Sequence, residues 1–182
     1  MLDVGCGTGL PTLFMLKKFD GKITAADPDQ EAIEYLKQKA VKSNLNNQFT
    51  LLNQSLFDLK GYDDHFDIVL AEGLLNIIGF EKGFIKLVSL AKSNGFIILH
   101  DEVKDHKRKL DIIANANCEL LNSFVLNQQI WWEDYYKCLE SAIANCTYKE
   151  LLELFNSDKK EIKAYKKNPT PFQSIYYIIK KN

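Results

Sequence analysis

Residues Leu2–Gly9 read LDVGCGTG, and this stretch decides the fold. Met1–Val4 predicts a short buried strand, and an amphipathic run follows the turn. Three glycines, Gly5, Gly7 and Gly9, lie in that turn. Glycine lets the backbone approach a ligand closely, and a helix N-terminus offers unpaired N–H groups to an anion. The stretch therefore predicts a strand, a ligand-binding turn and a helix, in that order.

The spacing of the glycines narrows the kind of ligand. GxGxG differs from the GxGxxG of the dinucleotide fingerprint because position 10 is Leu10, and no Gly-Lys-Ser/Thr of a P-loop follows. Taken alone, the turn is equally compatible with a tight connection that holds no ligand. The next predicted strand, Lys22–Ala26, favours the ligand-binding interpretation. It ends at Asp27, about twenty residues after the glycines, where an acidic side chain accepts hydrogen bonds from the ribose hydroxyls of a nucleoside. Asp29 is better placed to cap the following helix, which leaves Asp27 free.

Strand and helix patterns alternate from residue 1 to residue 126. The predicted strands are Leu2–Val4, Lys22–Ala26, Gln48–Leu52, Phe66–Ala71, Gly95–Asp101 and Glu119–Leu126; the predicted helices are Thr12–Lys18, Gln30–Ser43, Phe80–Ala91 and Lys107–Asn115; the predicted turns are Asp20-Gly21, Asn46-Asn47, Lys60-Gly61 and Asn94-Gly95. Such alternation predicts an α/β fold, a mostly parallel sheet with helices on both faces. Beyond it, Gln128–Cys146 and Tyr148–Lys166 predict helices, and Ser174–Lys180 predicts a final strand.

The ordered motifs resemble those of the class I S-adenosylmethionine-dependent methyltransferases. NQSLFDL (Asn53–Leu59), FDIVLAE (Phe66–Glu72) and GFIILHDE (Gly95–Glu102) stand in the order of that family's third, fourth and fifth strands. FDIVLAEG, GFEKG and the aromatic run WWEDYY resemble its small-molecule branch. The resemblance implies a Rossmann-like fold, a seven-stranded sheet whose last strand lies antiparallel beside the sixth, and one methyltransferase domain over residues 1–182 with a helical insertion at 127–167.

The resemblance also raises a question about the N-terminus. Family members carry upstream helices that close over the cofactor, whereas Met1 stands directly at the first predicted strand. We therefore expect the N-terminal cap to be absent. Either the sequence is a fragment or a mis-started gene model, which is the simpler account, or the protein lacks the cap.

The implied cofactor is S-adenosylmethionine, and the resemblance assigns its contacts residue by residue. Asp3 and the backbone of the glycine turn hold the methionine end, Asp27 accepts the ribose hydroxyls, Pro28 packs near the adenine, and the carbonyl of Ala71 receives the ammonium group. Many relatives carry an acid where this chain has Ser55, so the adenine contact at Ser55 is weaker here. The expected cofactor-binding residues are Asp3, Gly5, Cys6, Gly7, Asp27, Pro28, Ser55, Leu56 and Ala71.

The acceptor side is expected at the ends of the fourth and fifth strands. Glu72 is the best candidate for a catalytic residue, because it precedes a glycine where the chain must turn over the cofactor. His100, Asp101 and Glu102 end the next strand and could also face the methyl group, and His100 has a side chain suited to proton transfer near neutral pH. Four aromatic residues form two i,i+4 pairs on adjacent helix faces. One pair can pack on the core, and the other could line an acceptor pocket or form a dimer contact. The predicted pocket residues are Glu72, His100, Trp131, Trp132, Tyr135 and Tyr136.

Composition limits the partners. The chain has 182 residues and a net charge of −1, so it lacks the basic excess of a nucleic-acid-binding protein, and it has no apolar run of membrane-spanning length. The four cysteines form no CxxC pair, and no histidines are spaced for a metal; His65 and His106 are expected to be solvated. We therefore expect a cytoplasmic protein, a monomer or homodimer, with a small-molecule partner, no metal, no nucleic acid and no membrane.

The leading hypothesis is a metal-independent methyltransferase that transfers a methyl group from S-adenosylmethionine to a small molecule by in-line displacement. A nicotinamide-dependent oxidoreductase is the first alternative, and the GxGxG spacing argues against it. A non-catalytic binding or interaction module of the same fold is the second alternative.

Overall fold

A computed structural model describes residues 1–45, 49–148, 153 and 155–182. The chain divides into two compact units. Unit 1 comprises Met1–Asp101, Asp105–Phe124 and Tyr176–Asn182, and unit 2 comprises Glu102–Lys104 and Val125–Ile175. Each unit is described by itself.

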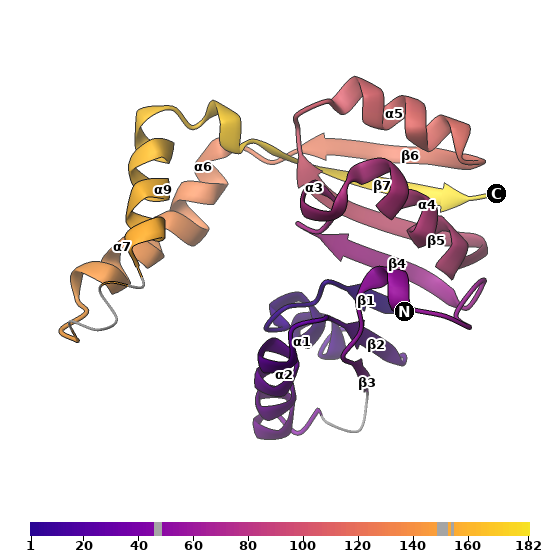
Figure 1. The fold of residues 1–182 in the computed structure, drawn as a ribbon, viewed down its shortest axis with the longest axis horizontal. Helices are drawn as coiled ribbons and strands as arrows, with labels where there is room; N and C mark the ends of the chain where they lie inside the picture. Colours follow the sequence, from indigo (N-terminus) through magenta and orange to yellow (C-terminus); the bar gives the residue numbers. More distant parts are fainter. Residues whose placement is uncertain (46–48, 149–152, 154) are drawn as a thin grey trace. The chain divides into compact units, whose positions relative to one another are not determined.

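Unit 1 is built on alternating strands and helices (Figure 1). In chain order they are β1 (Leu2–Val4), α1 (Leu10–Leu16), β2 (Ile23–Ala26), α2 (Gln30–Lys42), β3 (Phe49–Leu52), η1 (Leu56–Asp58), β4 (Phe66–Glu72), α3 (Leu75–Ile78), α4 (Phe80–Leu90), β5 (Ala91–Glu102), α5 (His106–Asn115), β6 (Cys118–Val125) and β7 (Ser174–Lys181). The last residues of β5 and β6 and the first of β7 continue into unit 2.

The seven strands form one sheet in the order β3-β2-β1-β4-β5-β7-β6. The pairs β1–β2, β1–β4, β2–β3 and β4–β5 are parallel. Strand β7 lies between β5 and β6 and runs antiparallel to both, as the arrows in Figure 1 show. The predicted Rossmann-like sheet with an antiparallel last strand beside the sixth is confirmed.

Helices α1 and α2 pack on one face of the sheet, over its first strands. Leu16 of α1, Ile23 of β2 and Ala40 of α2 belong to one buried apolar cluster. Helix α2 begins where Asp29 caps it, because the Asp29 carboxylate accepts the N–H groups of Glu31 (2.9 Å) and Ala32 (3.2 Å). The predicted capping role of Asp29 is therefore confirmed.

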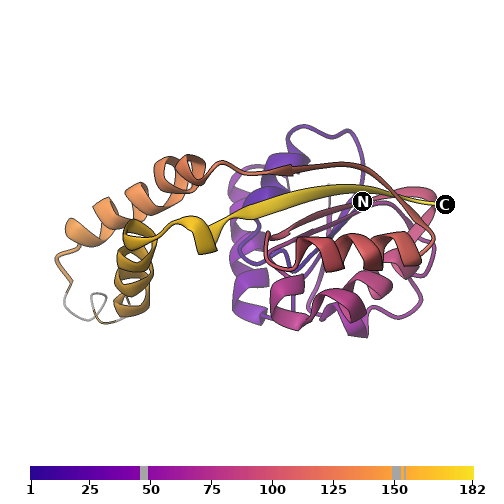
Figure 2. The ribbon, with the colours of Figure 1, turned by 90° about the horizontal axis from the view of Figure 1, so that it is seen from above.

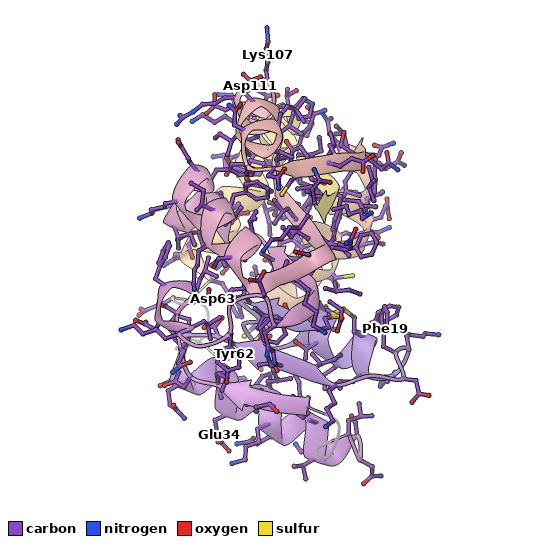
Figure 3. All side chains as sticks on the ribbon, turned by 90° about the vertical axis from the view of Figure 1, so that its right-hand side faces the viewer. Phe19, Glu34, Tyr62, Asp63, Lys107 and Asp111 are labelled. Atoms are coloured by element: carbon purple, nitrogen blue, oxygen red, sulfur yellow. The ribbon has the colours of Figure 1, made fainter. Side chains whose placement is uncertain are left out.

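Helices α4 and α5 cover the opposite face (Figure 2). Tyr177 of β7 is fully buried there and contacts the rings of Phe80 and His106. Figure 3 shows Lys107 and Asp111 projecting from the outer side of α5, whereas Lys109 and Ile113 of the same helix are buried. His106, which we expected to be solvated, instead bonds through Nδ1 to the hydroxyl of Tyr177 at 2.8 Å. That expectation was wrong because the sequence does not show that α5 begins against β7.

Strand β5 begins earlier than the sequence predicts. It starts at Ala91, immediately after α4, and includes the predicted turn at Asn94-Gly95. Phe66 pairs with Ala91 and Ile68 with Phe96, so residues 92–95 bulge opposite Asp67. Asn94 has φ 63°, and a Cβ on Gly95 would lie 2.8 Å from the carbonyl oxygen of Lys92. The turn signal therefore marks a bulge inside a strand.

Unit 2 contains α6 (Gln128–Trp131), a π-helical segment η2 (Trp132–Tyr136), α7 (Lys137–Ala144), α9 (Asn156–Lys167) and a 3-10 turn η3 (Thr170–Phe172). Its core is formed by Tyr136, Ile143, Ile162 and Tyr165. The predicted helix Gln128–Cys146 is thus interrupted by a π turn. The predicted helix Tyr148–Lys166 is confirmed over α9, and residues 149–152 and 154 of that prediction lie outside the described residues.

In unit 1, the predicted turn Asn46-Asn47 and the predicted strand start at Gln48 also lie outside the described residues.

Candidate functional site

The glycine turn connects β1 to α1 in a left-handed backbone. Gly5, Gly7 and Gly9 have φ angles of 70°, 50° and 78°. A Cβ on Gly9 would lie 2.2 Å from Leu36, so this glycine permits the approach of α2. A Cβ on Gly7 would meet no protein atom within 4 Å. Gly7 is therefore left with open space in front of it, where a ligand can approach the backbone.

Asp27 lies at the carboxyl end of β2 and binds the glycine turn. Its Oδ2 atom accepts the N–H of Gly7 and its Oδ1 atom accepts the N–H of Asp29, both at 2.9 Å. As expected, Asp29 and not Asp27 caps α2, but the loop after β2 folds back onto the Asp27 carboxylate and engages it. Each carboxylate oxygen has two lone-pair sites, so one on each oxygen remains for a ligand hydroxyl.

Asn53 was missed by the sequence analysis as a residue of this site. It follows β3, and its side-chain NH₂ donates to the carbonyl oxygens of Asp27 and Pro28, both at 3.0 Å. Asn53 thus ties the loop after β2 to the end of β3. An Asn directly after a predicted strand in a βα repeat was the available signal.

Asp3 is a buried carboxyl beneath the turn, with 2% of its surface exposed. The hydroxyl of Thr12 in α1 donates to its Oδ2 atom. Burial raises the pKa of Asp3 to about 6, the Thr12 hydrogen bond opposes this, and the charges of Glu72 and Asp27 add to the increase. Asp3 therefore titrates just below neutral pH and lies close to two other acids.

Cys6 lies inside the turn with its side chain buried against Ala25, Ile33 and Leu36. Burial raises the pKa of its thiol to about 12, so the thiol stays protonated at neutral pH. Its side chain therefore packs, and only its backbone is available to a ligand in the turn.

The remaining predicted cofactor residues lie at neighbouring strand ends. Ser55 donates from its hydroxyl to Asp58 at 2.5 Å, and Leu56 is buried at the start of η1. Ala71 is buried near the end of β4, where it pairs with Val4 of β1. The structure thus brings the ends of β1, β2, β3 and β4 to one edge of the sheet, and the contacts of these residues with a cofactor stay predictions.

Glu72 and His100, the two predicted acceptor residues of unit 1, are direct register partners on β4 and β5. Tyr176 of β7, which the sequence analysis missed, donates its hydroxyl to Glu72 Oε1 at 2.8 Å. Its ring stacks on His100 with centroids 4.5 Å apart. Burial is the main cause that lowers the pKa of His100, so this imidazole favours its neutral form. No motif signals Tyr176, because only the insertion of β7 next to β5 brings it here.

Asp101, the next residue of β5, points to the opposite face. Its Oδ2 atom pairs with Lys109 Nζ of α5 at 2.7 Å, and both side chains are buried. The same ammonium lies 5.3 Å from the centroid of the Phe80 ring. Asp101 therefore joins β5 to α5 and takes part in the core rather than in the row formed by Glu72 and His100.

Three of the four predicted pocket aromatics pack inside unit 2. Tyr136 is buried and donates to Glu161 at 2.6 Å, while Trp131 and Trp132 pack against the same core. Trp131 also donates from Nε1 to Ser174 at 3.0 Å. Tyr135 is 46% exposed. Core packing thus accounts for three of these residues, and the role of the four in a substrate pocket stays a prediction.

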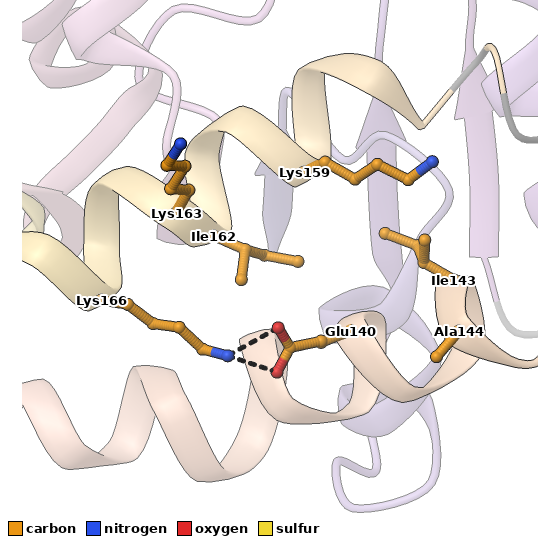
Figure 4. A pocket seen from close by; sticks show the side chains of 7 residues that line it. All are labelled: Glu140, Ile143, Ala144, Lys159, Ile162, Lys163 and Lys166. Atoms are coloured by element: carbon orange, nitrogen blue, oxygen red, sulfur yellow. Dashed lines mark hydrogen bonds and ion pairs between the residues drawn. The ribbon is translucent and has the colours of Figure 1, made fainter.

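Unit 2 also contains a hollow of about 360 Å³ between α7 and α9 (Figure 4). Ile143, Ala144 and Ile162 line it, with three lysines along the α9 side. Both carboxylate oxygens of Glu140 contact Lys166 Nζ at 2.6 Å, so one of these lysines is already paired.

Within the described part of the chain, no group of three or more His, Cys, Asp or Glu side chains is placed to hold a metal ion. Among the same residues, no helix has the length and apolar character needed to cross a membrane.

Comparison with known proteins addresses the fold first. The crystal structure of the [4+2]-cyclase SpnF superposes with a TM-score of 0.80 at 17% identity, covering 100% of this chain and 74% of that one. A geranyl diphosphate methyltransferase solved with GPP and sinefungin superposes with a TM-score of 0.72 at 12% identity, covering 100% and 71%. At these identities the likeness establishes the fold alone.

The sequence of the chain is similar to those of known methyltransferases. A ribosomal protein L11 methyltransferase of Dictyoglomus thermophilum is 33% identical over 116 residues, 64% of this chain and 36% of that protein. The ribosomal protein arginine N-methyltransferase rmt3 of Schizosaccharomyces pombe is 26% identical over 149 residues, 82% of this chain and 26% of that protein. The chain thus spans about a quarter to a third of the length of these two relatives. The model of the methyltransferase domain matches residues 1–143, and the chain belongs to this methyltransferase domain family.

Proposed function

We propose that this chain binds S-adenosylmethionine at the carboxyl ends of β1, β2 and β4 and transfers the methyl group to a small molecule. The observation that carries the proposal is the hydrogen bond from the Gly7 N–H to Asp27, which joins the glycine turn to the acid at the tip of β2. Membership of the methyltransferase domain family supports the same function.

The residues present fit the cofactor. The open space in front of Gly7 leaves room for a ligand against the turn, and the Asp27 carboxylate keeps acceptor sites for two ribose hydroxyls. We assign the methionine end to Asp3, to the backbone of Gly5–Cys6–Gly7 and to the carbonyl of Ala71. The adenine is assigned to Pro28 and to the loop at Ser55 and Leu56.

The protein's contribution to the reaction is mainly positioning. The cofactor supplies a methyl group activated by a positively charged sulfur. The chain's residues hold the two reactants in line and exclude water. Glu72 is the proposed catalytic residue, because its carboxylate is half-buried at the edge of the sheet and can accept a proton from an acceptor nucleophile. His100 is proposed to line the acceptor site beside it.

Titration calorimetry tests the cofactor assignment. We expect S-adenosylmethionine to bind and NAD to give no heat, since the turn lacks the GxGxxG spacing. Binding of NAD alone would favour the oxidoreductase alternative. Binding of S-adenosylmethionine without methyl transfer to any acceptor would favour the non-catalytic module.

A protein acceptor is the second candidate, because several of the sequence relatives are named as ribosomal protein methyltransferases. The two acceptor classes are separated by incubating the chain with S-adenosylmethionine that carries a radioactive methyl group and a fractionated cell extract. Label in the metabolite fraction supports a small-molecule acceptor. Label in the protein fraction would instead show that the acceptor is a protein and would overturn the small-molecule proposal.

We further propose that the enzyme works in the cytoplasm, as a monomer or homodimer that needs no metal and binds no nucleic acid. Residues 127–167 are proposed to be a helical insertion in a single methyltransferase domain, and the insertion carries Trp131, Trp132, Tyr135 and Tyr136.

A further inference from the structure

A row of side chains crosses one face of the sheet at the carboxyl ends of its strands. Asp3 of β1 pairs in register with Leu70 of β4, so both face the same side. Glu72 lies two residues after Leu70 and therefore shares that face. Its register partner His100 on β5 continues the row.

Tyr176 and Phe124 extend the row over β7 and β6. The ring of Tyr176 stacks on His100 on one side and on Phe124 on the other, with centroid distances of 4.5 Å and 5.3 Å. Glu72, His100 and Tyr176 are partly exposed, and Phe124 is 45% exposed. We call these five residues, Asp3, Glu72, His100, Tyr176 and Phe124, the acid–aromatic row. The row includes two carboxylates and no lysine or arginine.

The two carboxylates influence each other. The charge of Glu72 is one of the causes that raise the pKa of Asp3, after burial, and Asp27 contributes in the same direction. The field at this end of β1 and β4 is therefore negative. A positive charge placed there is favoured, because it relieves the repulsion between the acids.

Tyr176 restricts the Glu72 carboxylate. Its hydroxyl donates to Oε1 at 2.8 Å, and its ring is held between two other rings. Burial and the contact with Glu72 raise the pKa of Tyr176, so the phenol remains a donor at neutral pH. A donor with a fixed ring holds its acceptor in one orientation.

We propose that Tyr176 is a positioning residue that fixes the Glu72 carboxylate beside Asp3, and that these acids make the site prefer a ligand with a positive charge at sulfur. This inference rests on the proposed function. The sulfonium of S-adenosylmethionine carries that charge, and the thioether of S-adenosylhomocysteine, left after the methyl group has gone, does not. The acid–aromatic row therefore retains the methyl donor and favours release of the product.

Calorimetry on the full chain measures this preference without an acceptor. The ligands are S-adenosylmethionine, S-adenosylhomocysteine and sinefungin, whose amine places a positive charge near the sulfonium position. The readout is the ratio of affinities for each charged ligand and the neutral one. The variants are Glu72→Gln, which removes the charge at constant shape, and Tyr176→Phe, which removes the hydroxyl and keeps the ring stack. Tyr177→Phe is the matched control, because it removes a neighbouring hydroxyl on the opposite face.

We expect Glu72→Gln to reduce both ratios about tenfold, as loss of one nearby unit charge requires in a partly buried site. Tyr176→Phe should reduce them about threefold, and Tyr177→Phe should leave them unchanged. Unchanged ratios in Glu72→Gln would overturn the charge preference, and a loss in Glu72→Gln without one in Tyr176→Phe would overturn the positioning role. If the wild-type chain binds all three ligands but the affinity ratios are the same in both variants as in wild type, this inference fails and the proposed function stands. If the wild-type chain binds none of the ligands, the proposed function fails as well.

Discussion

Gly7 and Asp27, twenty residues apart in the chain, are joined by a hydrogen bond of 2.9 Å from the Gly7 N–H to the Asp27 carboxylate. The bond fixes the glycine turn after β1 against the loop after β2. It gives Asp27 two tasks, since the same side chain that is assigned to a ribose also holds the turn in which the cofactor would lie. Loss of this carboxylate is therefore expected to remove a ribose contact and, separately, to loosen the glycine turn.

Asp27→Ala is expected to weaken S-adenosylmethionine binding by at least tenfold, because hydrogen bonds to a charged acceptor contribute roughly 1.5–3 kcal/mol each. Calorimetry measures the affinity. Asp29→Ala is the matched control: it removes the cap of α2 at a cost of about 1 kcal/mol in stability and should leave the affinity unchanged. Equal loss of affinity in both variants would mean that Asp27 acts only through the loop.

Gly7→Ala and Gly9→Ala are expected to fail in different ways. Both impose the left-handed backbone on alanine, at about 1–2 kcal/mol. Gly9→Ala adds a collision with Leu36, so its melting temperature should fall further. Gly7→Ala meets no protein atom, so it should fold and lose cofactor affinity. Gly7→Ala protein that binds the cofactor normally would place the ligand elsewhere.

Asp3 predicts a pH dependence of stability. Its carboxyl has an ordinary pKa near 4 in the unfolded chain and a pKa of about 6 in the fold. A raised pKa means that the native state binds the proton more tightly, so the penalty is absent below pH 4, grows between pH 4 and 6, and is complete above pH 6 at about 3 kcal/mol. The free energy of unfolding of Asp3→Asn, relative to that of wild type, should therefore be higher at pH 7.5 than at pH 4.5.

Urea denaturation at the two pH values measures this effect. Asp111→Asn, an exposed site on α5, serves as the control and should give the same free energy difference from wild type at both. If Asp3→Asn also differs from wild type equally at pH 4.5 and pH 7.5, the buried carboxyl does not titrate in this range.

Lys109→Met is expected to lower the free energy of unfolding by about 3–5 kcal/mol, because it leaves the Asp101 carboxylate buried without its ammonium partner. Lys92→Met removes the partner of Asp67 in an exposed pair at 2.7 Å and should cost no more than about 1 kcal/mol. Thermal melts compare the two variants. The double variant Asp101→Asn/Lys109→Met should recover part of the loss, and a further loss would contradict an unpaired-charge origin.

The sequence by itself determined the α/β class, the order of most elements and the glycine turn followed by Asp27. These features depend on local signals: apolar periodicity, left-handed glycines and a capping acid at Asp29. The same local signals were insufficient at residues 92–95, where Asn94-Gly95 marks a bulge because β4 supplies pairing partners on both sides of it. They also did not reveal the π turn at Trp132–Tyr136, which changes the phase of the aromatic residues.

Only the tertiary structure decided which side chains meet at the edge of the sheet. Tyr176 contacts Glu72 across 104 positions of the chain, and Asn53 contacts the carbonyl of Asp27 across 26. Neither contact leaves a local pattern, because each follows from the order of the strands and from the antiparallel insertion of β7 between β5 and β6. The sequence alone determines where a strand ends and which residue stands there, whereas the partner of that residue depends on which strand the fold places next to it.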